Sequence, residues 1–183
     1  MEQLGRLQGY SGMLPLLMLI PLLQFHFADL PTTDWYIQND NVMGGMSEGR
    51  LELRESGLHW EGHTRLENNG GFSSIRSPWG RWDLREASEI RITCRGTGGP
   101  FKLVLNTSQL WYMPAVQAVF DVPEDWGAVA VPVGDLVWSQ VGSTAKPPVN
   151  AAQELGAVLR IGLMKYDGTA QPFEVDIADL TIQ

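Results

Sequence analysis

The sequence predicts an all-β fold, an antiparallel β-sandwich. Short stretches in which apolar and polar residues alternate recur along the chain, and clusters of Gly, Pro, Asn or Asp separate them. Two of the separating segments, residues 39–47 and 67–72, are turns rich in Asn and Gly. There is no β-α-β alternation, which disfavours a parallel, doubly wound sheet. At 183 residues the chain is long enough for one domain with a buried core.

The predicted strands follow one another from near residue 23 to the end of the chain. Residues 23–27 alternate as a half-buried first strand does. Only residues 149–155 read as a helix, and we expect a single domain over residues 23–183. The other predicted strands cover residues 50–54, 58–63, 72–76, 89–95, 101–106, 116–121, 128–133, 158–164, 173–177 and 180–182.

The N-terminal segment, residues 1–22, is rich in apolar residues. Its apolar run is shorter than the roughly 20 residues that a membrane-spanning helix needs, and its length fits the apolar region of a secretory signal. Cleavage after Ala28 would discard Phe25 and Phe27, which look like core residues of the first strand. A cleaved signal, an anchor and an upstream extension therefore all stay open. We expect a cytoplasmic or membrane-associated location, with export by a signal peptide as the alternative.

Charge and cysteine content exclude several classes of function. The net charge is −8 and there is no Lys/Arg cluster, so nucleic acid is not an expected partner. The single cysteine, Cys94, cannot form an internal disulfide, and no Cys/His set suits zinc. Cys94 alternates with Ile90 and Ile92, as a small buried residue on a strand would. The sequence predicts no metal and no cofactor.

The two Asn/Gly turns require a fixed backbone path. Gly accepts backbone angles that are closed to other residues, and Asn tolerates the left-handed region better than most. We expect the turns to lie close together on one face and to shape a binding surface. Its candidate residues are Asn39, Asp40, Met43, Gly44, Gly45, Ser47, Glu67, Asn68, Asn69, Gly70, Gly71, Phe72 and Arg76.

Two chemical hypotheses concern the first turn. Residues 45–49 match the pattern of a hydrolase nucleophile elbow around Ser47, but a strand pattern follows where that motif needs a helix. A turn in which the Ser47 hydroxyl bonds to local backbone is the better interpretation, and no catalytic residue is predicted. Asp40, with Asn39 and Asn41, could ligate a hard cation such as calcium. The alternative, which we favour, is an Asx turn.

The chain contains seven tryptophans, at positions 35, 60, 79, 82, 111, 126 and 138. Most are expected to fill the core, because a buried tryptophan removes a large apolar area from water. Trp79 and Trp82 lie in a predicted loop, and Trp111 and Tyr112 point to opposite faces of an extended segment. Exposed rings of this kind suit stacking on sugars or anchoring of a protein partner.

The chain resembles the complex I intermediate-associated protein 30 family over about residues 23–182. The matching residues are Trp35, Asn39, Asp40, Val42, Met43, Gly44, Gly45, Ser47, Gly62, Glu67 to Phe72, Arg76, Asp83, Leu84, Phe120, Trp126, Val131 to Val133, Ile161 to Met164, Gly168, Pro172, Phe173 and Ile182. Two segments depart from the family pattern in charged positions. Gly96 to Gly99 replace a frequent Gly-Asp-Gly, and Val141-Gly142 replace a usual Arg-Gly.

The resemblance implies a galactose-binding-like jelly roll of two packed antiparallel sheets. Mitochondrial members of the family help to assemble respiratory complex I and are not known as enzymes. The implied function is a non-enzymatic binding domain that acts through protein–protein contacts, with a respiratory-complex subunit or an assembly intermediate as partner. The alternative is a carbohydrate-binding module of the galactose-binding-like type, which rests on analogy between folds.

Overall fold

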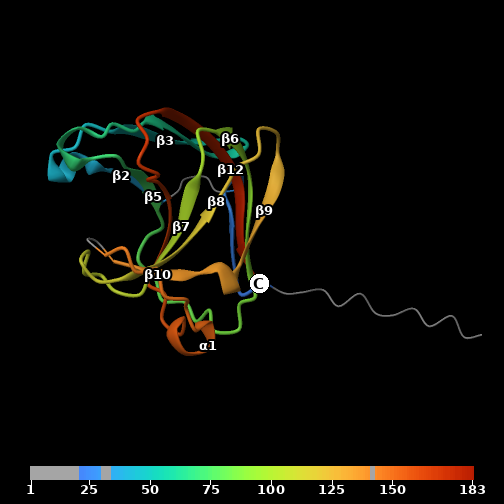
Figure 1. Ribbon diagram of the computed structural model, residues 1–183. Coiled ribbons are helices and arrows are strands. Elements are labelled where there is room, and N and C mark those ends of the chain that lie inside the picture. The colour runs from blue at the N-terminus through green and yellow to red at the C-terminus, as the bar shows by residue number, and fades with distance from the viewer. Residues whose placement is uncertain (1–20, 30–33, 141–142) are drawn as a thin grey trace, which may run out of the picture.

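The computed structural model describes residues 21–29, 34–140 and 143–183, which form two antiparallel sheets packed face to face (Figure 1). Sheet A contains β3 (Glu48–Arg54), β4 (Gly57–His63), β12 (Pro172–Ile182), β6 (Glu89–Thr97) and β9 (Gly127–Pro132) in that order, with β1 (Leu23–His26) also paired to β12. Sheet B contains β10 (Val137–Ser139), β8 (Ala115–Phe120), β7 (Phe101–Asn106), β11 (Arg160–Lys165), β5 (Ser73–Arg76) and β2 (Tyr36–Asn39) in that order. The predicted antiparallel β-sandwich is confirmed.

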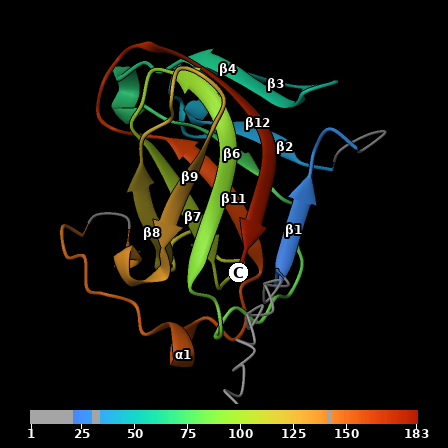
Figure 2. The same cartoon turned by 90° about the vertical axis from the view of Figure 1, so that its right-hand side faces the viewer.

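Strand β12 is the centre of sheet A. It pairs with β6 on one side, and with β4 and then β1 on the other. A register shift between Ile177 and Asp179 bends it, so two predicted strands are one continuous strand. Figure 2 shows β12, β6 and β9 on the side of the molecule that carries sheet A.

Two strands were missed by the sequence analysis, and the predicted helix was too long. The missed strands, β2 and β10, are short and form the two edges of sheet B. The helix α1 covers only Ala151–Glu154. The Glu154 side chain accepts a hydrogen bond from the Asn150 N–H at 2.6 Å, which stabilises this single turn.

The first strand belongs to the sandwich. The Phe27 side chain is fully buried, and its ring packs edge-on against Trp35 at 5.2 Å between centroids. Phe25 contacts Trp35 and Trp82 in the same way, at 5.4 and 6.3 Å. His26 pairs with Asp179 on β12. Of the N-terminal segment, residues 1–20 lie outside the described part of the chain, and no described helix is long and apolar enough to cross a membrane.

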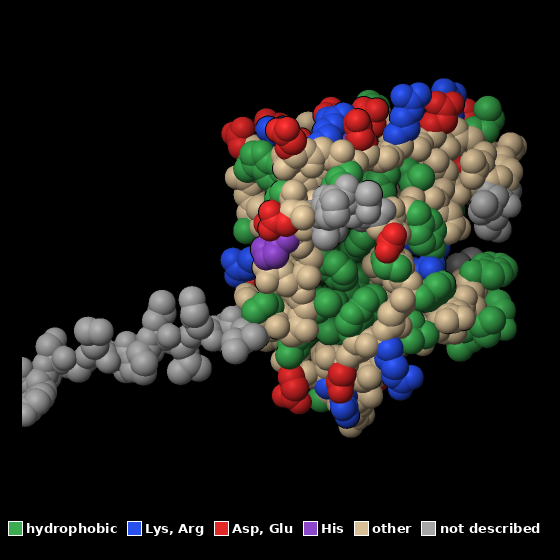
Figure 3. All heavy atoms as spheres, turned by 180° about the vertical axis from the view of Figure 1, so that it is seen from behind, with side chains coloured by type: hydrophobic (Ala, Val, Ile, Leu, Met, Phe, Trp, Pro, Cys, Tyr) green, Lys and Arg blue, Asp and Glu red, His purple; other side chains and the backbone are tan. Residues whose placement is uncertain are grey.

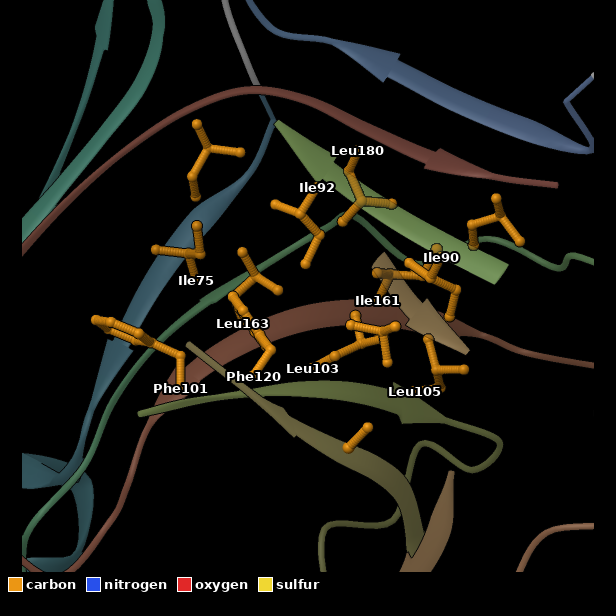
Figure 4. Packing of buried hydrophobic residues seen from close by; sticks show 14 of the residues in the cluster. Ile75, Ile90, Ile92, Phe101, Leu103, Leu105, Phe120, Ile161, Leu163 and Leu180 are labelled. Carbon is orange, nitrogen blue, oxygen red and sulfur yellow. The ribbon is translucent and has the colours of Figure 1, made fainter. Parts of the chain in front are cut away.

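The core lies between the sheets and follows their period of two. Alternate residues of facing strands point inward, among them Ile90, Ile92, Leu103, Leu105 and Ile161 (Figure 4). Towards one end, the rings of Trp60, Phe101 and Phe173 fill the space, with Trp60 at 4.9 Å from Phe173.

The free cysteine is part of this core. The Cys94 side chain is fully buried, and burial raises the pKa of its thiol to about 12. The thiol therefore stays protonated at neutral pH and packs as a small apolar group.

The outer face of sheet A carries charged side chains in pairs of opposite sign. On sheet A, acidic and basic side chains pair with one another: Arg54 with Glu52 at 2.9 Å, Arg91 with Glu89 at 2.6 Å, and Arg95 with Asp176 at 2.8 Å. Asp176 also bonds to the buried His59 at 2.7 Å, and hydrogen bonds from His59 and Arg95 outweigh burial to lower its pKa. Charged side chains of both signs line the top of Figure 3, where β3 and β4 lie.

Candidate functional site

The two Asn/Gly turns meet at one end of the sandwich. The first contains the 3₁₀ turn Asp40–Met43, which follows β2, and the second contains Glu67–Asn69, which precedes β5. Because β2 and β5 are paired neighbours, their connections leave sheet B at the same end. The Asn68 side-chain amide donates a hydrogen bond to the Gly44 carbonyl at 2.9 Å, so the turns are in direct contact.

The Asp40 carboxylate joins both turns. It is buried, and it accepts hydrogen bonds from Ser47 N–H at 3.0 Å and from Ser47 Oγ at 2.6 Å within the first turn. It also accepts from the N–H groups of Gly71 at 2.6 Å and Phe72 at 3.2 Å in the second. Burial alone would raise the pKa of Asp40, but these hydrogen bonds outweigh it and lower the pKa. Asp40 is therefore a charged, buried link between segments about thirty residues apart in sequence.

The Ser47 hydroxyl is held in place by hydrogen bonds. It donates to Asp40 and accepts a hydrogen bond from the Arg65 N–H at 3.0 Å. A carboxylate with a lowered pKa is a weak base. The segment that follows Ser47 is strand β3, whereas a nucleophile elbow leads into a helix. This arrangement holds a turn in place and gives no activated nucleophile.

The glycines of the turns fall into two kinds. Gly44 and Gly71 adopt φ angles of +85° and +121°, which other residues rarely adopt. Gly45 and Gly70 have no such angle, but a Cβ there would lie 2.3 Å from Asp40 Cγ and 2.5 Å from Asp40 Oδ2 respectively. The second kind of glycine thus makes room for the buried carboxylate.

The remaining predicted residues lie in different places. Glu67, Asn68 and Asn69 are exposed at the rim of the turns, and both asparagines adopt a φ of +58°. Phe72 contacts the Tyr166 ring at 6.3 Å. Asn39 donates a hydrogen bond to the Gly49 carbonyl at 3.3 Å. The side chain of Met43 lies outside the described part of the structure, as do the residues at 141–142.

Beside the turns lies a depression of about 610 Å³. Its lining includes the polar or charged residues Asn39, Asn41, Arg50, Glu61 and His63. Within the described residues, no group of three or more His, Cys, Asp or Glu is placed to hold a metal ion.

Arg76 belongs to a second feature, on the outer face of sheet B. Arg76 lies opposite Tyr36 in the β2–β5 pair, and Arg160 begins the neighbouring strand β11. The Arg160 guanidinium stacks on the Trp79 ring at 3.3 Å from its centroid and lies 5.2 Å from the Tyr36 ring. The sequence analysis missed Tyr36 and Arg160, although the alternation of Arg160 with Ile161 and Leu163 would have placed it on the outer face.

A third feature is the loop between β7 and β8. Its consecutive residues Leu110, Trp111, Tyr112 and Met113 are between 44% and 71% exposed. Next to them, a pocket of about 400 Å³ is lined by Met113, Pro114, Trp138 and polar residues of the loop after β10. Figure 1 shows this loop at the lower left. Figure 3 shows the molecule from behind, so the same side is at the right, and hydrophobic side chains gather at its lower right edge.

The first testable prediction concerns the Asp40 charge. Asp40→Asn should lower the free energy of unfolding by about 2–3 kcal/mol near neutral pH, because an amide cannot accept from all of these donors. The folded-state pKa of Asp40 is lowered, so its stabilisation is present above the unfolded pKa near 4 and is lost as pH falls through the folded value. Urea unfolding should therefore show the gap between the two proteins shrinking from about pH 6 to about pH 3. The exposed Asp125→Asn is the control, and a gap independent of pH would contradict this role.

The second prediction separates the two kinds of glycine. Gly44→Ala should cost about 1–2 kcal/mol, because it strains a left-handed residue in open space. Gly45→Ala should cost more, because its Cβ displaces the Asp40 carboxylate. In an Asp40→Ala background, the additional cost of Gly45→Ala should shrink, which a double-mutant cycle by denaturant unfolding measures. Additive costs would exclude a clash with Asp40 as the reason for this glycine.

The chain and its fold match known proteins. The family model of complex I intermediate-associated protein 30 (CIA30) matches residues 24–177. A search of the curated proteins finds no match. Among solved structures, the family 11 carbohydrate-binding module of the cellulosomal cellulase Lic26A-Cel5E of Clostridium thermocellum has a TM-score of 0.60 at 11% identity, with 88% of this chain and 96% of that chain covered.

Two further structures show the same fold. The family 11 module from Clostridium thermocellum in complex with a β-1,3-1,4-mixed-linked tetrasaccharide has a TM-score of 0.54 at 15% identity, with 87% and 94% covered. The agarase AgWH50C has a TM-score of 0.54 at 13% identity, with 90% of this chain and 24% of the agarase covered. At these identities the likeness shows the fold alone. The family model, by contrast, spans most of the chain, and its match includes both Asn/Gly turns of this chain, which Asp40 holds together. This protein therefore belongs to the complex I intermediate-associated protein 30 family, with a galactose-binding-like β-sandwich fold.

Proposed function

We propose that this protein is a non-enzymatic binding domain that acts through protein–protein contacts in the assembly of a membrane-associated respiratory complex. Membership of the complex I intermediate-associated family supports the respiratory part of the proposal. The buried, hydrogen-bonded setting of Ser47 and Asp40 supports the non-enzymatic part.

The observation that carries the proposal is the exposed apolar loop between β7 and β8. Leaving Leu110, Trp111, Tyr112 and Met113 in water costs free energy, at about 25 cal/mol for each Å² of apolar surface. Aromatic residues beside a pocket are the residues that most often dominate binding energy at protein interfaces. The neighbouring pocket, lined by Trp138, is of a size to receive an apolar side chain of a partner.

The end of sheet B opposite the β7–β8 loop carries the two Asn/Gly turns. Figure 1 shows the loops at both ends of sheet B projecting beyond its outer face. At one end, the Asp40 hydrogen bonds fix both Asn/Gly turns before any partner arrives. A surface that is already ordered loses less conformational entropy on binding, which strengthens association.

The third prediction tests this docking surface. Replacing Trp111 and Tyr112 together by alanine should leave the melting temperature nearly unchanged, because both side chains are mostly exposed. The same variant should lose co-purification of respiratory-complex subunits from native membranes, measured by quantitative mass spectrometry. The control is Trp126→Ala, which removes an exposed ring that stacks on Arg95 at 5.0 Å on the sheet A side. Equal recovery from all three proteins would refute the proposal, and so would recovery without respiratory subunits.

Carbohydrate binding is the second candidate function. It is favoured by the Tyr36 and Trp79 rings, which are exposed at the outer face of sheet B, and by the fold shared with a carbohydrate-binding module solved with a tetrasaccharide. Sugar rings stack on exposed aromatic side chains, so binding should change tryptophan fluorescence.

The fourth prediction decides on this candidate. Titration with β-1,3-1,4-mixed-linked oligosaccharides should change the emission of the wild type, and Trp79→Ala should abolish that change. Trp126→Ala is again the matched control. A flat response of the wild type to neutral oligosaccharides would remove carbohydrate binding from consideration.

A further inference from the structure

The outer face of sheet B holds two arginines side by side. Arg76 pairs with Tyr36 on one side and with Gly162 on the other. Arg160 precedes Gly162 by two residues on β11 and so lies on the same face. The Arg160 guanidinium lies 5.2 Å from the Tyr36 ring, Tyr36 lies opposite Arg76 in the strand register, and Arg76 Nε donates to Ser74 Oγ at 3.1 Å.

Arg160 is buried without full hydrogen bonding. The residue is 7% exposed, and its guanidinium lies 3.3 Å from the Trp79 ring centroid and 5.2 Å from that of Tyr36. Its Nε is buried and has no hydrogen-bond partner in the structure. A buried charged donor left unpaired is costly, and such groups are normally satisfied by a partner.

Among the described residues, no carboxylate forms an ion pair with either arginine. The residues that the strand register places on the outer face of sheet B are Tyr36, Gln38, Ser74, Arg76, Lys102, Val104, Asn106, Ala115, Gln117, Val119, Val137, Ser139, Arg160, Gly162 and Met164. None is Asp or Glu, although the whole chain carries a net charge of −8. On sheet A, by contrast, arginines 54, 91 and 95 each pair with a carboxylate.

The pair is also electrostatically unfavourable as it stands. Burial lowers the pKa of Arg76 and of Arg160, the Tyr36 side chain partly opposes both shifts, and the positive charge of Arg76 lowers the pKa of Arg160 further. A bound anion would relieve both effects. Gly162 leaves the face beside Arg76 without a side chain, and a Cβ there would lie 3.5 Å from Arg76 Cγ.

We infer that Arg76, Arg160 and Tyr36 form a cradle for a carboxylate, supplied by an acidic side chain of the protein partner. Guanidinium groups bind carboxylates through parallel N–H···O bonds, and two adjacent guanidiniums with a phenol provide donors on several sides of one carboxylate. The inference rests on the proposed function, because it identifies the chemistry by which that partner is recognised.

A protein carboxylate fits the surroundings of the cradle. Arg160 pairs with Asn106, and the exposed apolar loop begins directly after Asn106. The cradle and the loop therefore lie at the same end of sheet B. A partner segment that carries an acidic residue beside apolar residues would engage both, whereas an acidic sugar would engage the cradle and leave the loop in water.

The fifth prediction tests the cradle with defined ligands. Two blocked pentapeptides serve as probes: one alternates glutamate with leucine, and the other has glutamine in place of each glutamate. The glutamate peptide should shift the Arg76 and Arg160 Nε–H resonances in ¹⁵N NMR spectra, and the glutamine peptide should not. Arg76→Gln and Arg160→Gln should each weaken the glutamate peptide by about tenfold or more, since each removes hydrogen bonds to a charged group.

Three further variants keep the test specific. Arg54→Gln removes an arginine from sheet A and should leave peptide binding unchanged, which separates the cradle from the general effect of charge. Arg160→Lys keeps the charge but loses the planar group and should also weaken binding. If Arg160→Gln does not fold, Tyr36→Phe and Arg76→Gln carry the test, with melting temperatures recorded for each.

Several outcomes would overturn the inference. These are unmoved Nε–H resonances, equal shifts with both peptides, or equal weakening by Arg54→Gln. Shifts with galacturonate oligomers but not with the glutamate peptide would assign the carboxylate to a sugar and overturn the protein source. If the arginine variants capture respiratory subunits as the wild type does while the Trp111 and Tyr112 variant does not, the cradle fails and the proposed function stands. If the glutamate peptide binds specifically but no respiratory subunit is captured, the cradle stands and the proposed function fails.

Discussion

The buried Asp40 carboxylate determines the shape of one end of the sandwich. Its charge is compensated by N–H and O–H donors, which come from its own turn and from the turn before β5. Each donor has to be brought to the carboxylate by a particular backbone path, and that requirement explains the glycines around it. The rim of the outer face of sheet B is therefore set by hydrogen bonding as much as by apolar packing.

Much of this fold could be predicted, because strands with one buried face alternate visibly in sequence. The missed strands, β2 and β10, are edge strands in which few residues are buried, so their alternation is weak. The turns were predicted from their Gly and Asn content, but the role of Asp40 depends on donors far away in sequence. The cluster of Tyr36, Arg76 and Arg160 could not be predicted either, since it needs the register of β2, which sequence did not reveal.

The two outer faces differ in how their charged side chains are paired. Several charged side chains of sheet A pair with one another, as Arg95 does with Asp176. On the described part of sheet B, cationic groups without a carboxylate partner lie beside aromatic rings, close to an exposed apolar loop. A fold shared with carbohydrate-binding modules does not by itself determine the ligand, because recognition depends on the side chains that the fold presents.

The central place of β12 has a consequence for biosynthesis. Sheet A cannot close until residues 172–182 have left the ribosome, because β1, β4 and β6 all pair with them. Until then, the earlier strands have open edges and an incomplete core, the state in which nascent chains aggregate most readily. The domain must fold after its synthesis is nearly complete, and its long-range pairing makes that step slow compared with the folding of a helical protein of similar size.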